Sequence, residues 1–140
     1  MIHYHGSPCS GPADVVGRFY AGRHAMVSFA YPDQLECIAK VCQSFALDNG
    51  AFTHWRKGGA VDVLAYREWV IEWERHPGFA WCLIPDVIDG TARDNDDMIT
   101  EWITSGVRAM SVPVWHFHES AERLCSLAAQ FPLVALGSSG

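Results

Sequence analysis

Short apolar segments alternate with helical patterns along this chain, and the alternation restricts its fold more than any other feature. The apolar runs lie at 1–4, 25–29, 44–47, 80–84, 109–114 and 133–136. They are too short for helices and show little polar alternation, as is typical of strands in a sheet covered on both faces. Helical patterns fill most of the intervals, so the sequence predicts an α/β fold with about six parallel strands.

Apolar residues recur at helical spacing in the segments 32–43, 62–74, 94–106 and 120–130. Asp62 and Ser120 stand where a helix N-cap is expected, and Gly106 stands where a helix would end. Strands and helices in this order form either an open doubly wound sheet or most of a (β/α)8 barrel. Because a complete barrel usually takes about 250 residues, the chain would stop short of closing one.

The length of 140 residues predicts a single domain over 1–140, and 49% hydrophobic residues give it a globular composition. No apolar run approaches the roughly 20 residues of a membrane span, and the N-terminus lacks the features of a signal peptide. The five cysteines form no CxxC pair and no zinc-like cluster. We interpret them as reduced thiols of a cytoplasmic protein.

The formal net charge of −6 is distributed unevenly, with +1 over residues 1–60 and −7 over residues 61–140. Broad electrostatic wrapping of nucleic acid needs many cationic contacts, so this balance disfavours it. A local contact near Arg18, Arg23, Arg56 and Lys57 remains open.

Polar or glycine-rich residues follow each apolar run. The carboxyl ends of parallel strands meet at one edge of an α/β sheet, so these residues are expected to converge on one rim, where ligands bind. The candidates on this rim are Asp48, Asn49, Gly50, Asp86, His116, His118, Glu119 and Gly137.

Several of these candidates also have a purely structural interpretation. Asp48, Asn49 and Gly50 are typical of an Asx-turn, and Asp89 with Gly90 is typical of a plain turn. His116 and His118, two apart in a strand, would point to the same face. That geometry allows metal ligation, but without a third ligand we predict no metal site.

Two carboxylates on neighbouring strand ends can divide the work of a site, because one exchanges protons while the other accepts hydrogen bonds from a substrate. A pocket for a purine-like base needs acceptors for ring N–H and amino groups and donors for a carbonyl. Asp48 and Asp86 would be the acceptors, and His116 and the backbone N–H of Gly137 the donors.

The segments "LDNGAF", "IPDVIDG" and "VALGSSG", in that order at strand ends, resemble the tRNA-guanine transglycosylase superfamily. The closest resemblance is to its phage and bacterial branch, which acts in 7-deazaguanine modification of DNA. The resemblance implies a (β/α)8 barrel that exchanges guanine in tRNA or DNA for a 7-deazaguanine through a covalent aspartate intermediate. It covers only the N-terminal part of the family barrel, so we expect a truncated barrel.

The resemblance also implies roles for individual residues. Asp48 begins the motif Asp48-Asn49-Gly50-Ala51-Phe52, where the family has Asp-Ser-Gly-Gly-Phe, and it would act as general acid and base. Asn49, Gly50 and Phe52 would contact the base by the same match. Beyond the motif, three residues would bind the base: Asp86, Gly137 through its backbone N–H, and His116 in place of a family glutamine.

No residue here matches the nucleophilic aspartate or the zinc ligands of the family. The chain is therefore expected to bind guanine or a 7-deazaguanine weakly, without a cofactor, and not to exchange bases alone. Open barrel edges would favour self-association. Two other interpretations remain: a metal-dependent barrel or open-sheet hydrolase that uses Asp48, Asp86 and His116, and a non-catalytic interaction module.

Overall fold

The computed structural model describes residues 1–137, in which parallel strands alternate with helices. The strands are β1 (Tyr4–Gly6), β2 (His24–Ser28), β3 (Ser44–Asp48), β4 (Phe79–Leu83), β5 (Ser111–Val112), β6 (Val114–His116) and β7 (Ala135–Gly137). The helices are α1 (Ala13–Tyr20), α2 (Leu35–Ala39), α3 (Ala51–Arg56), α4 (Val63–Trp73), α5 (Ala92–Thr104) and α6 (Ala121–Gln130), with a short 3₁₀ helix, η1, at Pro32–Gln34. The predicted α/β class is confirmed.

The main sheet contains β1 to β5 in chain order, and every neighbouring pair is parallel. A second sheet pairs β6 with β7, also in parallel. Only Pro113 separates β5 from β6, and because proline has no N–H to donate, it interrupts the hydrogen-bond ladder. Within residues 1–137, strand order therefore follows chain order without the reversal that marks a doubly wound sheet.

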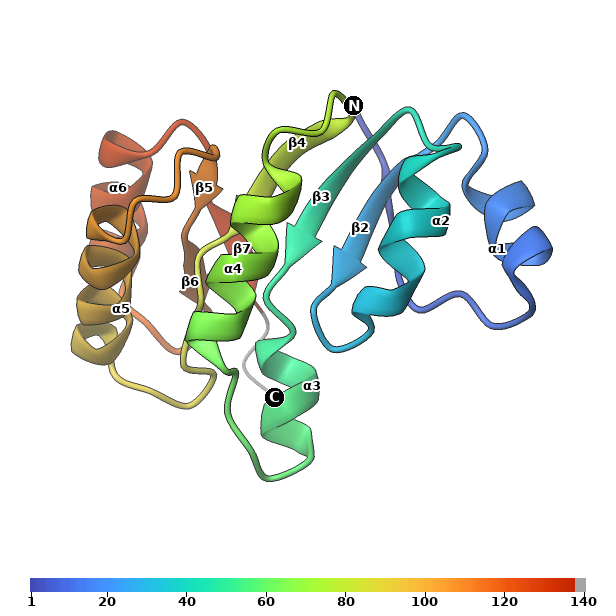
Figure 1. Cartoon of the computed structure of the whole chain (residues 1–140). Coiled ribbons are helices and arrows are strands. Elements are labelled where there is room, and N and C mark those ends of the chain that lie inside the picture. Colours follow the sequence, from blue (N-terminus) through green and yellow to red (C-terminus); the bar gives the residue numbers. More distant parts are fainter. Residues whose placement is uncertain (138–140) are drawn as a thin grey trace.

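Helices cover one face of the main sheet, and the main hydrophobic core lies between them and the strands (Figure 1). Phe45 and Leu47 of β3 are fully buried there. Fully buried helix residues pack into the same core, namely Tyr20, Leu35, Ile38, Tyr66 and Val70. Because burial of each large apolar side chain stabilises a fold by about 1.5–3 kcal/mol, this layer holds the helices on the sheet.

The opposite face of the sheet carries a second, smaller cluster to which only strands contribute. Leu83, Val112 and Val114 are buried in it, with Met26, Trp81 and Ala135 packed against them. These residues come from β2, β4, β5, β6 and β7, so the cluster joins the two sheets across Pro113.

Each of the four predicted helical segments contains a helix, and the N-caps of α4, α5 and α6 explain where these three begin. Asp62 accepts a hydrogen bond from the backbone N–H of Ala65 (3.0 Å), and Ser120 accepts one from Arg123 (3.2 Å), as predicted. Helix α5 begins earlier than predicted, at Ala92, because Thr91 forms a reciprocal capping box with Asp94.

Other boundaries and elements differ from the prediction. The helix expected over 32–43 ends at Ala39 and follows the 3₁₀ turn η1. Helices α1 and α3 were not predicted, since α1 contains Gly17 and α3 is a single short segment without an apolar stripe. The run at 109–114 is divided by Pro113, and the first and last strands lie nearer the C-terminus than expected.

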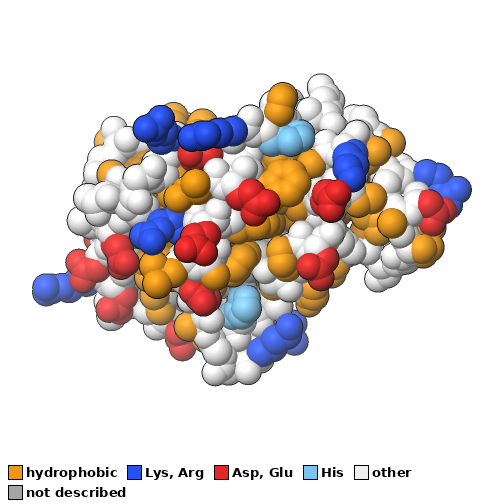
Figure 2. Space-filling view, in the orientation of Figure 1, with side chains coloured by type: hydrophobic (Ala, Val, Ile, Leu, Met, Phe, Trp, Pro, Cys, Tyr) orange, Lys and Arg blue, Asp and Glu red, His pale blue; other side chains and the backbone are white. Residues whose placement is uncertain are grey.

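Acidic side chains are scattered over the helix-covered face rather than gathered in one patch (Figure 2). Lys and Arg side chains are interspersed among them, so this face offers no broad cationic surface. No helix in the part of the chain that the structure describes has both the length and the apolarity needed to cross a membrane.

Candidate functional site

The turn after β3 brings the first carboxylate to the rim of the sheet. Asp48 ends the strand, and its Oδ2 accepts a hydrogen bond from the backbone N–H of Gly50 (3.2 Å). Gly50 has a φ of +75°, and a Cβ there would lie 2.9 Å from the backbone nitrogen of Ala30. The Asx-turn interpretation is therefore confirmed, and it places the carboxyl group of Asp48 at the edge where ligands bind in parallel sheets.

Asn49 is buried and its side chain is fully engaged. Its Nδ2 donates hydrogen bonds to the backbone oxygen of Ile84 (2.8 Å) and to Oδ1 of Asp86 (2.7 Å). Its Oδ1 accepts one from the backbone N–H of Ala51 (2.8 Å). Because both amide hydrogens are used, Asn49 orients Asp86 in this structure and has no side-chain donor left for a ligand.

His116 approaches Asp86 from the other side. Its Nε2 lies 2.9 Å from Oδ2 of Asp86, and both side chains are almost fully buried. The ring is not aligned for a hydrogen bond at either nitrogen within residues 1–137. The two side chains are therefore in close contact without an aligned hydrogen bond, and the ring nitrogens keep hydrogen-bonding capacity.

Gly137 lies opposite His116 in the register of β6 and β7. A Cβ at Gly137 would approach Cγ1 of Val114 to 2.8 Å and Nδ1 of His116 to 3.1 Å. Any larger residue would displace the His116 ring, so glycine is required here by packing. The remaining residues of the "GSSG" segment, 138–140, lie outside the described residues.

The carboxyl group of Asp48 has a raised pKa, and burial is the largest cause. Burial raises the pKa of the Asp48 carboxyl group, the Ser28 hydroxyl and the Gly50 N–H lower it, and the negative charge of Asp86 raises it further. The net effect is a pKa above the ordinary value of an aspartate. Asp48 is thus better suited to taking up and releasing a proton near neutral pH than an exposed aspartate is.

A cavity of about 140 Å³ connects these groups at the strand ends. Cavities of about 150 Å³ hold one small aromatic ring, so a larger planar ligand would have to extend through the mouth. Gly50 is not in the lining, although the sequence singled it out. The lining consists of Asp48, Asn49, Ala51, Phe52, Leu83, Asp86, Ile88, Val114, His116 and Gly137.

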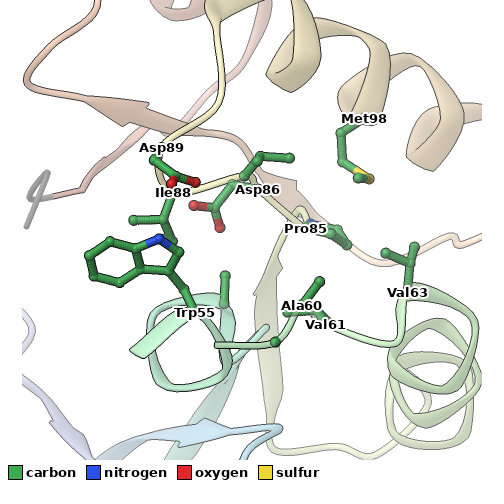
Figure 3. A pocket seen from close by; sticks show the side chains of 12 residues that line it. Trp55, Ala60, Val61, Val63, Pro85, Asp86, Ile88, Asp89 and Met98 are labelled. Carbon is green, nitrogen blue, oxygen red and sulfur yellow. The ribbon is translucent and has the colours of Figure 1, made fainter. Parts of the chain in front are cut away.

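A second cavity, of about 170 Å³, lies on the other side of Asp86 and shares Ala51 and Ile88 with the first. Trp55 closes one end, and Val63 and Met98 lie at the other (Figure 3). Its lining is largely apolar, so it resembles a pocket for an apolar group more than a polar reaction site.

His118 does not lie beside His116 in a strand, so the prediction that strand geometry points both to one face was wrong. Strand β6 ends at His116, and His118 follows in a turn, where its Nε2 lies 3.1 Å from the backbone oxygen of Gly90. The two rings nevertheless stack, with centroids 5.6 Å apart. Among residues 1–137, no three potential metal ligands come together.

Sequence reasoning missed the roles of the residues that brace the rim. Tyr66, interpreted as part of an apolar stripe, donates its hydroxyl hydrogen to the backbone oxygen of Leu83 (2.8 Å) and lies 3.3 Å from that of Leu47. It therefore ties together the ends of β3 and β4, which carry the two carboxylates. Asn95 and Glu119 are buried behind the rim, and spacing alone gave no signal for their contact.

Comparison of the chain with models of protein families, with curated proteins and with solved structures finds no match. A proposal for function therefore rests on the geometry of the rim.

Proposed function

We propose that this chain is the base-recognition part of a transglycosylase-like protein that acts on guanine or a 7-deazaguanine in nucleic acid. The observation that carries the proposal is the cavity in which Asp48, Asp86, His116 and Gly137 meet at the ends of different strands. Each of the three sequence segments that resemble the family contributes lining residues to this cavity, which gives further support.

The architecture is proposed to be an incomplete (β/α)8 barrel. The sequential parallel order of the strands supports this, as does the confinement of the main core to one face of the sheet. In a closed barrel, the strand-only cluster around Leu83, Val112 and Val114 would be the interior. An open doubly wound sheet would instead have helices on both faces.

The polar groups of the cavity suit the edge of a guanine-like base. The carboxylate of Asp86 would accept hydrogen bonds from a ring N–H and an exocyclic amino group, and His116 would donate to the carbonyl. Asp86 now accepts from Asn49 and faces His116, so both neighbours hold it in place for the ligand. Asp48, with its raised pKa, would exchange the proton of the base.

Calorimetric titration with guanine and with 7-cyano-7-deazaguanine tests this assignment. We expect measurable binding by the wild-type chain and at least about a tenfold loss of affinity, roughly 1.4 kcal/mol, in Asp86→Ala. Asp89→Ala is the matched control, because Asp89 lies in the same loop but borders only the second cavity. Equal affinities for wild type and Asp86→Ala would contradict the proposal.

No residue of this chain matches the nucleophile of the resembling family, so we propose that the chain binds the base without exchanging it. Incubation with a guanine-containing oligonucleotide and labelled base should then incorporate no label. Incorporation that depends on Asp48 would show that the 140 residues contain a nucleophile.

A nucleic acid is favoured over a free base by a cationic and aromatic depression beside the cavity. Phe52 borders both hollows, and the depression is also lined by Tyr31, Arg56 and Lys57. Arg56 lies over the Phe52 ring and Lys57 over the Tyr31 ring, at 5.8 and 5.6 Å from the centroids. Neither cation is paired with a carboxylate within residues 1–137, so both are available to phosphates.

Fluorescence anisotropy with short guanine-containing DNA and RNA oligonucleotides tests the partner. Arg56→Ala combined with Lys57→Ala should weaken oligonucleotide binding and reduce its salt dependence, while the affinity for free guanine stays unchanged. Arg18→Ala is the control, because Arg18 already pairs with Asp14. Comparison of the two oligonucleotides shows which nucleic acid is preferred, and equal binding by all variants would contradict the assignment.

A further inference from the structure

A buried carboxylate lies directly behind the rim, in the turn that follows β6. Oε2 of Glu119 accepts hydrogen bonds from the backbone N–H of His116 (3.0 Å) and from Nη1 of Arg123 (2.6 Å). Arg123 also binds Asp96 of α5 through Nη2 (2.7 Å) and Nε (3.1 Å). Glu119 therefore connects the backbone of His116 to two helices.

Asn95 extends this connection to the loop that carries Asp86. Its Oδ1 accepts a hydrogen bond from the backbone N–H of Val87 (2.8 Å), and its Nδ2 donates to the backbone oxygen of the same residue (3.3 Å). Nδ2 also lies within hydrogen-bonding distance, 3.4 Å, of Oε1 of Glu119. Because Val87 directly follows Asp86, a continuous polar network joins the backbones beside both base-facing residues.

The ring of His116 depends on this network for its position. Within residues 1–137 neither ring nitrogen makes a hydrogen bond, so the ring is fixed by packing, by its backbone and by the 2.9 Å contact between Nε2 and Oδ2 of Asp86. Glu119 holds that backbone through the His116 N–H, and Gly137 packs against the ring. A movement of the Glu119 carboxylate would therefore move the ring relative to Asp86.

Apolar side chains could fill the space behind the rim without these buried polar and charged groups. Buried ion pairs contribute little net stability compared with apolar residues of similar volume, and their best-established use is to fix one arrangement. We propose that Asn95 and Glu119 are positioning residues that set the distance and orientation between the Asp86 carboxylate and the His116 ring. That this positioning also determines which base is preferred rests on the proposed function, since Asp86 and His116 are the groups assigned to the base.

The test compares two ligands that differ at one edge. 2,6-Diaminopurine carries an amino group where guanine has the carbonyl assigned to His116, and it lacks the ring N–H assigned to Asp86. The ratio of the two affinities therefore reports how these two groups are placed relative to each other. Asn95→Asp keeps the acceptor for Val87 but puts a second carboxylate against Glu119. Glu119→Gln keeps an acceptor for the His116 N–H but removes the charge that pairs with Arg123.

We expect both variants to reduce the preference for guanine over 2,6-diaminopurine by at least about fivefold. Val70→Ala, on the buried face of α4, is the control for lost stability. A smaller folded population lowers both affinities by the same factor and leaves their ratio unchanged. An unchanged ratio in Asn95→Asp and Glu119→Gln would overturn the positioning role.

A ligand-free measurement separates this inference from the proposed function. If the wild type binds neither base, the proposed function fails, but the position of His116 can still be read from the NMR signals of its ring, assigned with His116→Gln. The signals should shift in Asn95→Asp and in Glu119→Gln and stay in place in Val70→Ala. Signals that stay in place in all variants would overturn the inference.

Discussion

At the scale of single residues, Gly50 is constrained twice. Its φ of +75° is costly for residues with a side chain, and a Cβ would collide with the backbone of Ala30 at 2.9 Å. It therefore shapes the turn that carries Asp48, and it does so without lining the cavity. The small size of Gly50 serves the backbone of the neighbouring loop and not a bound base.

Replacement of Gly50 by alanine should lower the free energy of unfolding by about 1–3 kcal/mol through strain and collision. Gly58→Ala is a matched control, because Gly58 has the same φ of +75° but nothing within 4 Å of the added Cβ. Urea unfolding of both variants measures the difference, which isolates the contact with Ala30. Equal losses would mean that only the dihedral angle matters.

The raised pKa of Asp48 predicts a pH dependence with a definite sign. The folded state holds this proton more tightly than the unfolded state, so the stabilising contribution is complete below the ordinary value of 3.8 and is lost as pH rises through the folded pKa. Asp48→Asn removes this loss. The stability of the variant relative to wild type should therefore rise with pH above about 3.8 and then level off.

Urea unfolding of wild type and Asp48→Asn over a series of pH values measures this difference. The comparison with wild type cancels contributions from exposed carboxyl groups whose pKa is lowered, such as Glu36 and Asp94. A difference that is constant with pH would contradict a raised pKa for Asp48.

At the scale of secondary structure elements, patterning predicted the strands better than it predicted the helices. Apolar runs mark strands most clearly where both faces are covered, as in β3, where Phe45, Ala46 and Leu47 are all fully buried. Helix α3 was not predicted because it is too short to show an apolar stripe. Strands β5 and β6 were predicted as one strand because Pro113 lies within one apolar run. Such local interruptions depend on tertiary packing that a window of sequence does not contain.

Some residues of the candidate site could likewise be predicted from the sequence, and others could not. Asp48, Asp86, His116 and Gly137 could be named from sequence because each follows an apolar run, and the structure brings them to one cavity. The roles of Tyr66, Asn95 and Glu119 could not be predicted, because their contacts join elements far apart in the chain. Sequence spacing also could not show that Asn49 uses both amide hydrogens for contacts within the protein.

Tyr66 provides a prediction about how β3 and β4 are held together. Tyr66→Phe removes the hydroxyl that binds the backbone oxygen of Leu83, and it should destabilise the fold by about 1–3 kcal/mol. Tyr20→Phe breaks a similar bond, to the backbone oxygen of Gly6 in β1, on the same face of the sheet but away from β3 and β4. Thermal unfolding should detect both losses, but only Tyr66→Phe should also weaken binding of guanine. Equal effects on binding would contradict a bracing role.

At the scale of the whole molecule, both sheets end in strands that lack one neighbour. Within residues 1–137, β1 and β5 in the main sheet and β6 and β7 in the second sheet each pair on one side only. Pro113 joins β5 to β6, whereas β1 and β7 lie at the two outer ends, and Leu136 of β7 is 62% exposed. Exposed strand edges with apolar side chains are templates for pairing with another chain. We therefore expect the isolated chain to self-associate through these edges.

Leu136→Lys should shift the mass measured by light scattering toward the monomer, because a charge on an edge strand opposes edge-to-edge pairing. Ile103→Lys is the control, since Ile103 is 59% exposed but lies on helix α5. Self-association that persists in Leu136→Lys, or that is lost equally in Ile103→Lys, would contradict the edge account.

The central claim is that the carboxyl ends of the strands bind a guanine-like base, and NMR titration with 7-cyano-7-deazaguanine tests it most directly. A hollow at the opposite end of β4, lined by Glu74, Arg75 and Arg108, provides an internal control. We predict that the largest amide shifts fall at Asp48, Asp86, His116 and Gly137. Shifts centred on the opposite hollow, or none at saturating ligand, would contradict the claim.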